Sequence, residues 1–280
     1  MLSPKELLLA ALILVTAIYT AAWIRPRWLD TAVGFVTNFF DTLGIGSFAT
    51  TTSFYRLRKQ MPDELIPGTL NVGHTLPTVA QALIYITLVE VEVTTLVLLI
   101  AAAVAGSWLG AGFVSRLPRR QIQAGMGLAL LGAAVLMALT AMDAMPGGGT
   151  ALRLTGVQLG VGIGVNFVLG ALMTLGIGLY APCMVLVSLL GMNPTAAFPI
   201  MMGSCAFLMP AASLRFIRFG RYDMAAAIGL ALGGVPAVLV AAYLVKSLPL
   251  DYVRWLVVAI AGYAAITLVR AGLKPAAANT

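Results

Sequence analysis

Charged residues are scarce in this chain, and their scarcity excludes most classes of protein. Of its 280 residues only 10% are charged, whereas 60% are hydrophobic and the mean hydropathy is +0.98. A soluble domain carries about 25% charged residues, so the composition excludes a soluble globular fold of this size. It predicts a polytopic membrane protein that has a lipid bilayer as its surroundings.

Cysteine and histidine are also rare. The two cysteines, Cys183 and Cys205, lie within apolar sequence, so no extracellular disulfide framework is predicted. The chain has one histidine, His74, and its sequence holds no P-loop, zinc-protease motif, catalytic triad or cluster of metal ligands. We therefore expect no enzyme activity, no catalytic residue, no metal and no other cofactor.

Acidic residues are outnumbered, with 10 Asp and Glu against 17 Lys and Arg. The basic residues form short clusters between apolar runs, which is how a multi-span protein is oriented in a membrane. Proteins that bind nucleic acid instead gather such residues on one face or along one helix. We expect no nucleic-acid partner.

Long uncharged stretches indicate where the chain crosses the membrane, since one helical crossing needs about 20 apolar residues. Leu7–Ile24 is followed by Arg25-Pro26-Arg27 rather than by a small-residue cleavage site, so we expect a retained first helix and no signal peptide. The further expected spans are Leu65–Val89, Val93–Ser115, Gln121–Met142, Met224–Val245 and the shorter Trp255–Val269. These patterns predict an all-α protein.

Two apolar segments are interrupted by glycine and proline. The stretch from Leu154 to Leu214 has 61 uncharged residues, too many for two straight spans, and contains Gly176-Ile177-Gly178 and Pro182. The segment between Arg27 and Arg56 is broken in the same way at Gly44-Ile45-Gly46. We expect a broken or re-entrant helix at each of these places.

An internal repeat relates the two breaks. Thr42–Gly46 recurs identically as Thr174–Gly178, a shift of 132 residues. The same shift pairs Pro62 with Pro194, Pro67 with Pro199 and Leu76 with Leu208, and a shift of 131 pairs Leu117-Pro118 with Leu248-Pro249. The sequence therefore predicts one transmembrane domain with an extra N-terminal helix (1–30), a first repeat (31–142) and a second repeat (153–271).

The positions of the basic residues favour repeats of inverted topology. Placing residues 25–27, 56–59, 116–120, 215–221 and 270–274 inside puts 13 of the 17 basic residues in the cytoplasm, whereas a parallel arrangement divides them about 9 to 8. This orientation gives a cytoplasmic C-terminus and a periplasmic N-terminus. Inversion needs an odd number of crossings per repeat, so each broken segment enters and leaves on one side, as a re-entrant hairpin or a pair of short helices.

Two broken helices that meet near the membrane midplane are typical of a transporter site. The free N–H groups and positive dipole end of each half-helix would attract an anion. The expected substrate-binding residues are Gly44, Gly46, Ser47, Thr50 and Thr51 at the first break, Gly176, Gly178, Tyr180 and Cys183 at the second, and Asn71 and Ser204 on the helices that follow. The same glycines and threonines can instead serve close helix packing.

Titratable groups near the breaks have alternative roles. Asp41 precedes the first break, where it could bind a coupling proton or cap a helix N-terminus. His74 could titrate near neutral pH or serve as a hydrogen-bonded structural residue. The thiols of Cys183 and Cys205 could bond reversibly with a sulfur anion, or could be small buried hydrophobic groups.

The duplicated segments Gly44–Thr50 and Gly176–Pro182 resemble the glycine motif of the TauE/SafE family of membrane transporters. That family shows Gly-x-Gly-Gly-Gly followed by proline, and then a leucine-glycine-x-proline step. Leu190–Pro194 fits this step, Gln60-Met61-Pro62 keeps only its proline, and Ser47-Phe48 and Leu179-Tyr180 replace the central glycines. The resemblance extends over nearly the whole chain through repeat length and loop positions.

The resemblance implies a transporter of sulfite or organosulfonate anions in the bacterial inner membrane, most members being exporters. We therefore expect a secondary transporter that exports a small sulfur oxyanion or sulfonate by alternating access. An importer of thiosulfate or a similar anion that uses a cysteine, and an anion channel, stay as alternatives. A homodimer also stays open.

Overall fold

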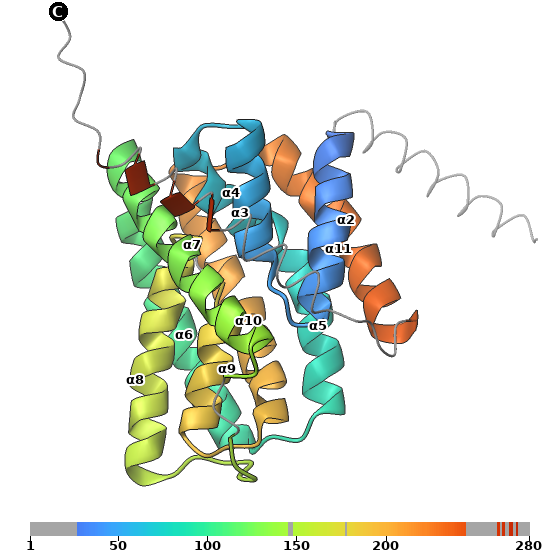
Figure 1. Ribbon diagram of the computed structural model, residues 1–280, viewed down its shortest axis with the longest axis vertical. Coiled ribbons are helices and arrows are strands. Elements are labelled where there is room, and N and C mark those ends of the chain that lie inside the picture. The colour runs from blue at the N-terminus through green and yellow to red at the C-terminus, as the bar shows by residue number, and fades with distance from the viewer. Residues whose placement is uncertain are drawn as a thin grey trace, which may run out of the picture.

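The structure is a computed structural model that describes residues 27–144, 148–176 and 178–244, together with the single residues 262, 263, 265, 266, 269, 270 and 273. Its described regular elements are helices, most of which run along the long axis of the molecule (Figure 1). Those long and apolar enough to cross a membrane are Val93–Val114, Gly156–Met173, Pro194–Arg218 and Met224–Tyr243. The prediction of an all-α protein with several membrane spans is thus confirmed.

Parts of the sequence-based scheme lie outside the described residues. They are the extra N-terminal helix up to residue 26, the Leu248-Pro249 pair and most of the span Trp255–Val269.

The first half of the described chain contains two broken segments rather than one. Its elements are α2 (Trp28–Thr42), α3 (Ser47–Arg58), η1 (Asp63–Leu65), α4 (Ile66–Gly73), α5 (Thr75–Leu88), α6 (Val93–Val114) and α7 (Arg119–Ala141). The expected single span Leu65–Val89 is wrong, because α4 and α5 are separate helices that meet at His74. Pro77 contributes to this interruption, since it has no N–H to donate to the carbonyl of Gly73.

As far as the structure describes it, the second half has the same order of elements as the first, except that one helix, α10, stands where the first half has α4 and α5. Its elements are α8 (Gly156–Met173), α9 (Tyr180–Leu189), η2 (Pro194–Ala196), α10 (Ala197–Arg218) and α11 (Met224–Leu244). Backbone conformation recurs at the offset of 132 residues: Gly44 and Gly176 have φ of +92° and +90°, and Lys59 and Gly191 have φ of +49° and +77°. The matching left-handed residues end equivalent helices in the two halves.

The most extensive helix pairings are α2 with α11 and α6 with α8. Under the offset of 132 residues these are the same pairing with the halves exchanged. Backbones touch at both crossings, since a Cβ atom on Gly34 would overlap the backbone of Leu230 and one on Gly170 would overlap the carbonyl of Ala103. Such close approach of small residues is how helices associate in a bilayer. Each half is therefore held by helices of the other half.

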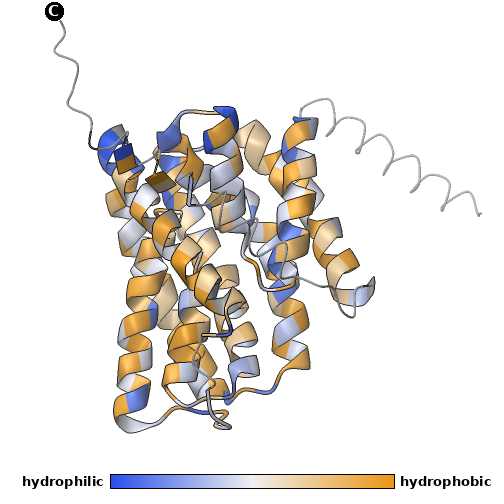
Figure 2. Cartoon of the chain, viewed as in Figure 1, coloured by the Kyte–Doolittle hydropathy of each residue, from blue (hydrophilic) through white to orange (hydrophobic). Residues whose placement is uncertain are grey.

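Polarity is segregated along the long axis. Figure 2 shows hydrophobic residues along the helices and hydrophilic residues gathered toward their ends. The connections α3–η1, α6–α7 and α10–α11 lie at the same end as the start of α2, and the α5–α6 and α9–η2 connections lie at the other (Figure 1). The first group carries the basic clusters Arg56-Leu57-Arg58-Lys59, Arg116–Arg120 and Arg215–Arg221, whereas Glu90 and Glu92 lie in the second.

Candidate functional site

The first break is a tight turn between α2 and α3. Helix α2 ends at Thr42, and the turn is closed by hydrogen bonds from Gly44 N to Asp41 O at 2.9 Å and from Ile45 N to Phe40 O at 3.0 Å. Gly44 and Gly46 both adopt positive φ, the conformation that glycine adopts without steric cost. Helix α3 then starts at Ser47, so its first backbone amides have no carbonyl one turn earlier in the same helix to bond.

The second break has the same form between α8 and α9. Gly176 N donates to Met173 O at 2.9 Å, which matches the bond from Gly44 N to Asp41 O. Helix α9 begins at Tyr180, and Cys183 N closes its first turn on Leu179 O at 2.9 Å.

The two breaks lie against each other inside the molecule. A Cβ atom on Gly178 would lie 4.0 Å from Cβ of Phe48, and one on Gly176 would lie 3.7 Å from Oγ1 of Thr52. A cavity of about 10 Å³ remains where they meet, lined by Asp41, Gly46, Ser47, Phe48, Thr78, Met173, Gly178, Leu179, Tyr180 and Cys205. This volume suits about one water molecule.

Asp41 is the centre of a buried polar network at this cavity. Its side chain is 2% exposed and accepts hydrogen bonds from Ser47 N at 2.5 Å, Gln81 Nε2 at 2.8 Å and the Tyr180 hydroxyl at 3.2 Å. The three donors come from α3, α5 and α9. The Asp41 carboxylate therefore connects the first break, at α3, with helix α5 and with the second break, at α9.

Gln81 and Tyr85 extend the network along α5. Gln81 Nε2 also lies 3.0 Å from Thr42 Oγ1, and its Oε1 accepts from the Tyr180 hydroxyl at 2.8 Å. The Tyr85 hydroxyl donates to the carbonyl of Thr42 at 2.7 Å. The end of α2 is thereby fixed to α5 on one side and to α9 on the other.

His74 lies in a second buried network beside the first. Its Nδ1 is 3.0 Å from Asn38 Nδ2 and 3.1 Å from Asn38 Oδ1, and its Nε2 is 3.1 Å from Thr51 Oγ1. The Phe48 ring packs 5.8 Å from the imidazole, measured between centroids. The histidine ties α2 to α3, as a hydrogen-bonded structural residue would.

The predicted site residues fall into several places in the structure. Gly46, Ser47, Gly178, Tyr180 and Asp41 line the cavity between the breaks. Gly44 and Gly176 shape the two turns, and Thr51 bonds His74. Away from the cavity lining, Asn71 donates to the carbonyl of Pro67, Ser204 accepts from Asn166, and Cys183 is fully buried.

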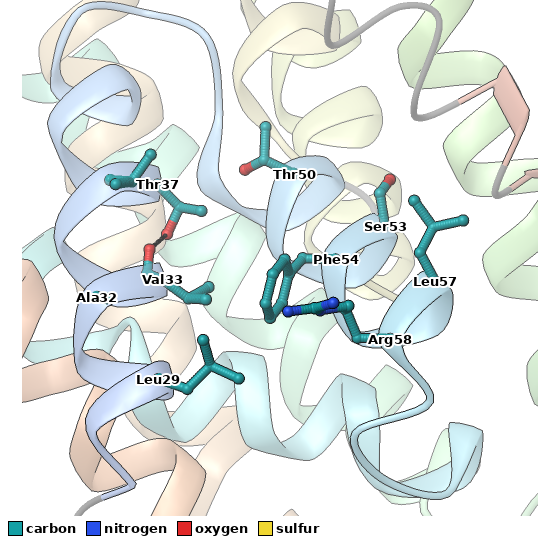
Figure 3. A pocket seen from close by; sticks show the side chains of 10 residues that line it. Leu29, Ala32, Val33, Thr37, Thr50, Ser53, Phe54, Leu57 and Arg58 are labelled. Carbon is teal, nitrogen blue, oxygen red and sulfur yellow. Dashed lines mark hydrogen bonds between the residues drawn. The ribbon is translucent and has the colours of Figure 1, made fainter.

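Thr50 faces a different space, an apolar groove between α2 and α3. Figure 3 shows Leu29, Val33 and Thr37 of α2 on one side of the groove and Thr50, Phe54 and Leu57 of α3 on the other. The groove has a volume of about 570 Å³ and is bounded at one end by Arg58. It is separate from the residues that line the cavity at Asp41.

Thr78 and Cys205 line the cavity and Gln81 bonds Asp41, although none of the three was among the expected substrate-binding residues. His74, Thr78 and Gln81 are spaced four and three residues apart, so they share one face of a helix. This spacing indicates that Thr78 and Gln81 lie together. Cys205 was expected only as a thiol that could bond a sulfur anion, and its position in the lining, with Sγ 3.6 Å from Sδ of Met173, depends on the packing of α10 on α8.

Comparison with protein families supports the resemblance. Residues 3–137 match the profile of the family described as Sulfite exporter TauE/SafE, which confirms the resemblance over the part of the chain that holds the first glycine segment. No curated protein and no solved structure is significantly similar to the chain.

Proposed function

From the match of residues 3–137 to the sulfite exporter TauE/SafE family, we propose that this chain is a secondary transporter that exports sulfite or an organosulfonate across the bacterial inner membrane. The family is one of membrane anion transporters, and the apolar helices agree with a multi-pass membrane protein. The substrate, the direction and the mechanism below are our proposal.

The meeting of two helix breaks at a buried polar cavity is the observation that carries this proposal. An anion there would find the Ser47 amide at the start of α3, the Gln81 amide and the Tyr180 hydroxyl, all neutral donors, which bond Asp41 in this structure. Hydrogen bonds to a charged acceptor are about twice as strong as neutral ones. Several neutral donors without a full positive charge suit a carrier, because the anion must be released as well as bound.

The proposed mechanism is alternating access around this cavity. We infer that α2–α3 and α8–α9 are re-entrant segments of two inverted repeats, with the basic end of the molecule in the cytoplasm. The exchanged pairings of α2 with α11 and α6 with α8 support the duplication, and the small volume of the cavity agrees with a site that must open to admit an anion. Rocking of one half against the other would open the cavity to either side.

The test is flux of sulfite and of sulfonates in proteoliposomes, with and without a pH gradient. Saturable flux supports a carrier, flux that does not saturate supports a channel, and no flux of any of these anions contradicts the proposal.

A bulky residue at Gly178 tests the assignment of the site. Gly178 has no positive φ and its nearest neighbour across the gap is 4.0 Å away, so a Cβ atom fits there, whereas the rest of a leucine side chain exceeds the cavity and must displace its walls. Folding of Gly178→Leu is checked by size-exclusion chromatography, and Gly178→Ala replaces it if that protein fails to fold. We expect at least a tenfold loss of flux. Gly164→Leu, on an exposed face of α8 with nothing within 4 Å, is the matched control. Equal flux in both variants would disprove this location of the site.

An importer of thiosulfate or a similar anion stays as a second candidate because one thiol reaches the cavity. Cys205 lines it beside Met173, whereas Cys183 is buried outside the lining. An obligatory thiol would make a cysteine-free protein inactive. Full activity of a Cys183→Ala, Cys205→Ala protein would exclude this alternative.

A further inference from the structure

The carboxylate of Asp41 takes the donors that an anion in the cavity would need. Its oxygens accept from the first amide of α3, from the Gln81 amide and from the Tyr180 hydroxyl. Among the described residues, no lysine or arginine is bonded to it. Asp41 is therefore held in the way the proposed substrate would be held, by neutral groups at a helix N-terminus.

A second feature beside Asp41 indicates that the space between the breaks is built for a polar ligand. The Thr52 hydroxyl of α3 is fully buried and has no hydrogen-bond partner among the residues that the structure describes. It lies beside Gly176 in the second break. A buried donor without a partner costs free energy, and an anion between the breaks would give it one.

The number of donor hydrogens in the network is compatible with either an ionised or a protonated Asp41. The Tyr180 hydroxyl carries one proton, and it lies 3.2 Å from Asp41 Oδ2 and 2.8 Å from Gln81 Oε1. If Tyr180 donates to Asp41, the carboxyl group accepts every bond that the network makes with it, which favours its ionised form. If Tyr180 donates to Gln81, its contact with Asp41 is a hydrogen bond only when Asp41 carries a proton. One rotation of the hydroxyl separates the two arrangements.

Among the described residues that line the cavity, Asp41 is the one carboxylic acid. The other titratable side chains around it are Tyr180 from α9, Tyr85 from α5 and Cys205 from α10. Helix α11, which packs on α2, carries no charged side chain, and the nearby His74 is bonded to Asn38 and Thr51. A negative substrate in the cavity would thus meet one fixed negative charge, that of Asp41.

We propose that the carboxylate of Asp41 takes the place of the substrate in the empty site. It accepts the hydrogen bonds that the anion would accept, and it releases these donors when it binds a proton. This inference rests on the proposed function. Two negative charges in so small a buried space repel each other strongly, so the anion enters only with a neutral Asp41. One proton is taken up as each anion binds and is released when the anion leaves.

The test is the pH dependence of sulfite affinity, measured by calorimetry on the full-length protein in detergent at pH 6 and pH 8. Sulfite itself titrates in this range, so the wild type is compared with Asp41→Asn, in which the linked group is lost and the substrate's own titration is unchanged. One linked proton changes affinity by at most about tenfold per pH unit. We expect the Kd of the wild type to rise from pH 6 to pH 8 by about tenfold or more beyond the rise in Asp41→Asn. At pH 8 the variant should bind more tightly than the wild type.

Controls separate this inference from the proposed function. Glu92→Gln removes a carboxylate remote from the cavity and should keep the wild-type pH dependence. Asp41→Ser keeps an acceptor for the start of α3 and replaces Asp41→Asn if that protein fails to fold. Equal pH dependence in wild type and variant, or weaker binding by a folded variant at both pH values, would overturn the inference. Where sulfite does not bind, the same comparison is made with a sulfonate, and no binding of either anion by the wild type and either variant would refute the proposed function itself, and the inference with it.

Discussion

Glu92 illustrates how one side chain fixes the start of a membrane helix. Its carboxylate accepts hydrogen bonds from Thr94 N at 2.9 Å, Thr95 N at 2.7 Å and Thr95 Oγ1 at 2.7 Å, at the first turn of α6. These bonds, with those of Thr94 foremost, lower the pKa of Glu92 from its ordinary 4.5 to about 2. The ionised carboxylate is therefore favoured in the folded protein.

This shift predicts a pH-dependent effect of Glu92→Gln on stability. A depressed pKa contributes stability above the unfolded value near 4.5, and that contribution is lost as the pH falls through 4.5 toward about 2. The melting temperature of the variant should be lower than that of the wild type by a constant amount above pH 5. The gap should close between about pH 4.5 and 2. Glu90→Gln is the control, and a gap that does not depend on pH would contradict the prediction.

At the scale of the residue, the sequence indicated the types of residue at the candidate site better than it indicated their positions. The sequence placed Asp41, Ser47 and Tyr180 beside the breaks, since a break in an apolar segment is visible in the sequence, and all three line the cavity. Asn71 and Ser204 face backbone or side-chain partners elsewhere. The direction in which a helix turns its polar side chains depends on its neighbours, which the sequence of one helix does not specify.

At the scale of elements, the crossing of α6 and α8 depends on glycine. A Cβ on Gly170 would overlap the carbonyl of Ala103, and one on Gly106 would overlap that of Phe167. Gly170→Val should therefore separate the helices or prevent assembly, at a cost of about 1–3 kcal/mol, as for other overpacked interiors. Thermal unfolding in detergent measures this loss. Gly164→Val, on the exposed face of the same helix, should unfold like the wild type, and equal unfolding of both variants would contradict the packing described here.

The limits of elements were predictable where glycine, proline or charge ends a helix. The span expected over Val93–Ser115 corresponds to α6 at Val93–Val114. The interruption at His74 was missed because the stretch Leu65–Val89 contains no Asp, Glu, Lys or Arg and is long enough for one span. Its break depends on Pro77 and on the contacts of His74 with Asn38 and Thr51, two residues that belong to other helices.

At the scale of the whole molecule, alternating access requires the two breaks to separate. A Cβ on Gly178 would lie 4.0 Å from Cβ of Phe48, within the 3.5–4.5 Å that a disulfide spans. We expect Phe48→Cys with Gly178→Cys, in a Cys183→Ala, Cys205→Ala background, to form a bond that stops flux. A reductant should restore flux, and each single cysteine variant should be indifferent to oxidation. Flux that continues with the bond formed would contradict rocking at this contact.

The small cavity at Asp41 has a consequence for the cell that holds the protein. A membrane voltage is worth about 2.3 kcal/mol per elementary charge for every 100 mV. A continuous file of water molecules through the broken helices would let protons cross and dissipate such a voltage. The space at Asp41, lined by Phe48, Leu179 and Met173 among others, has a volume of about 10 Å³ and holds about one water molecule, too few for such a file. The proposed transporter can therefore stay in an energised membrane without conducting protons through this site.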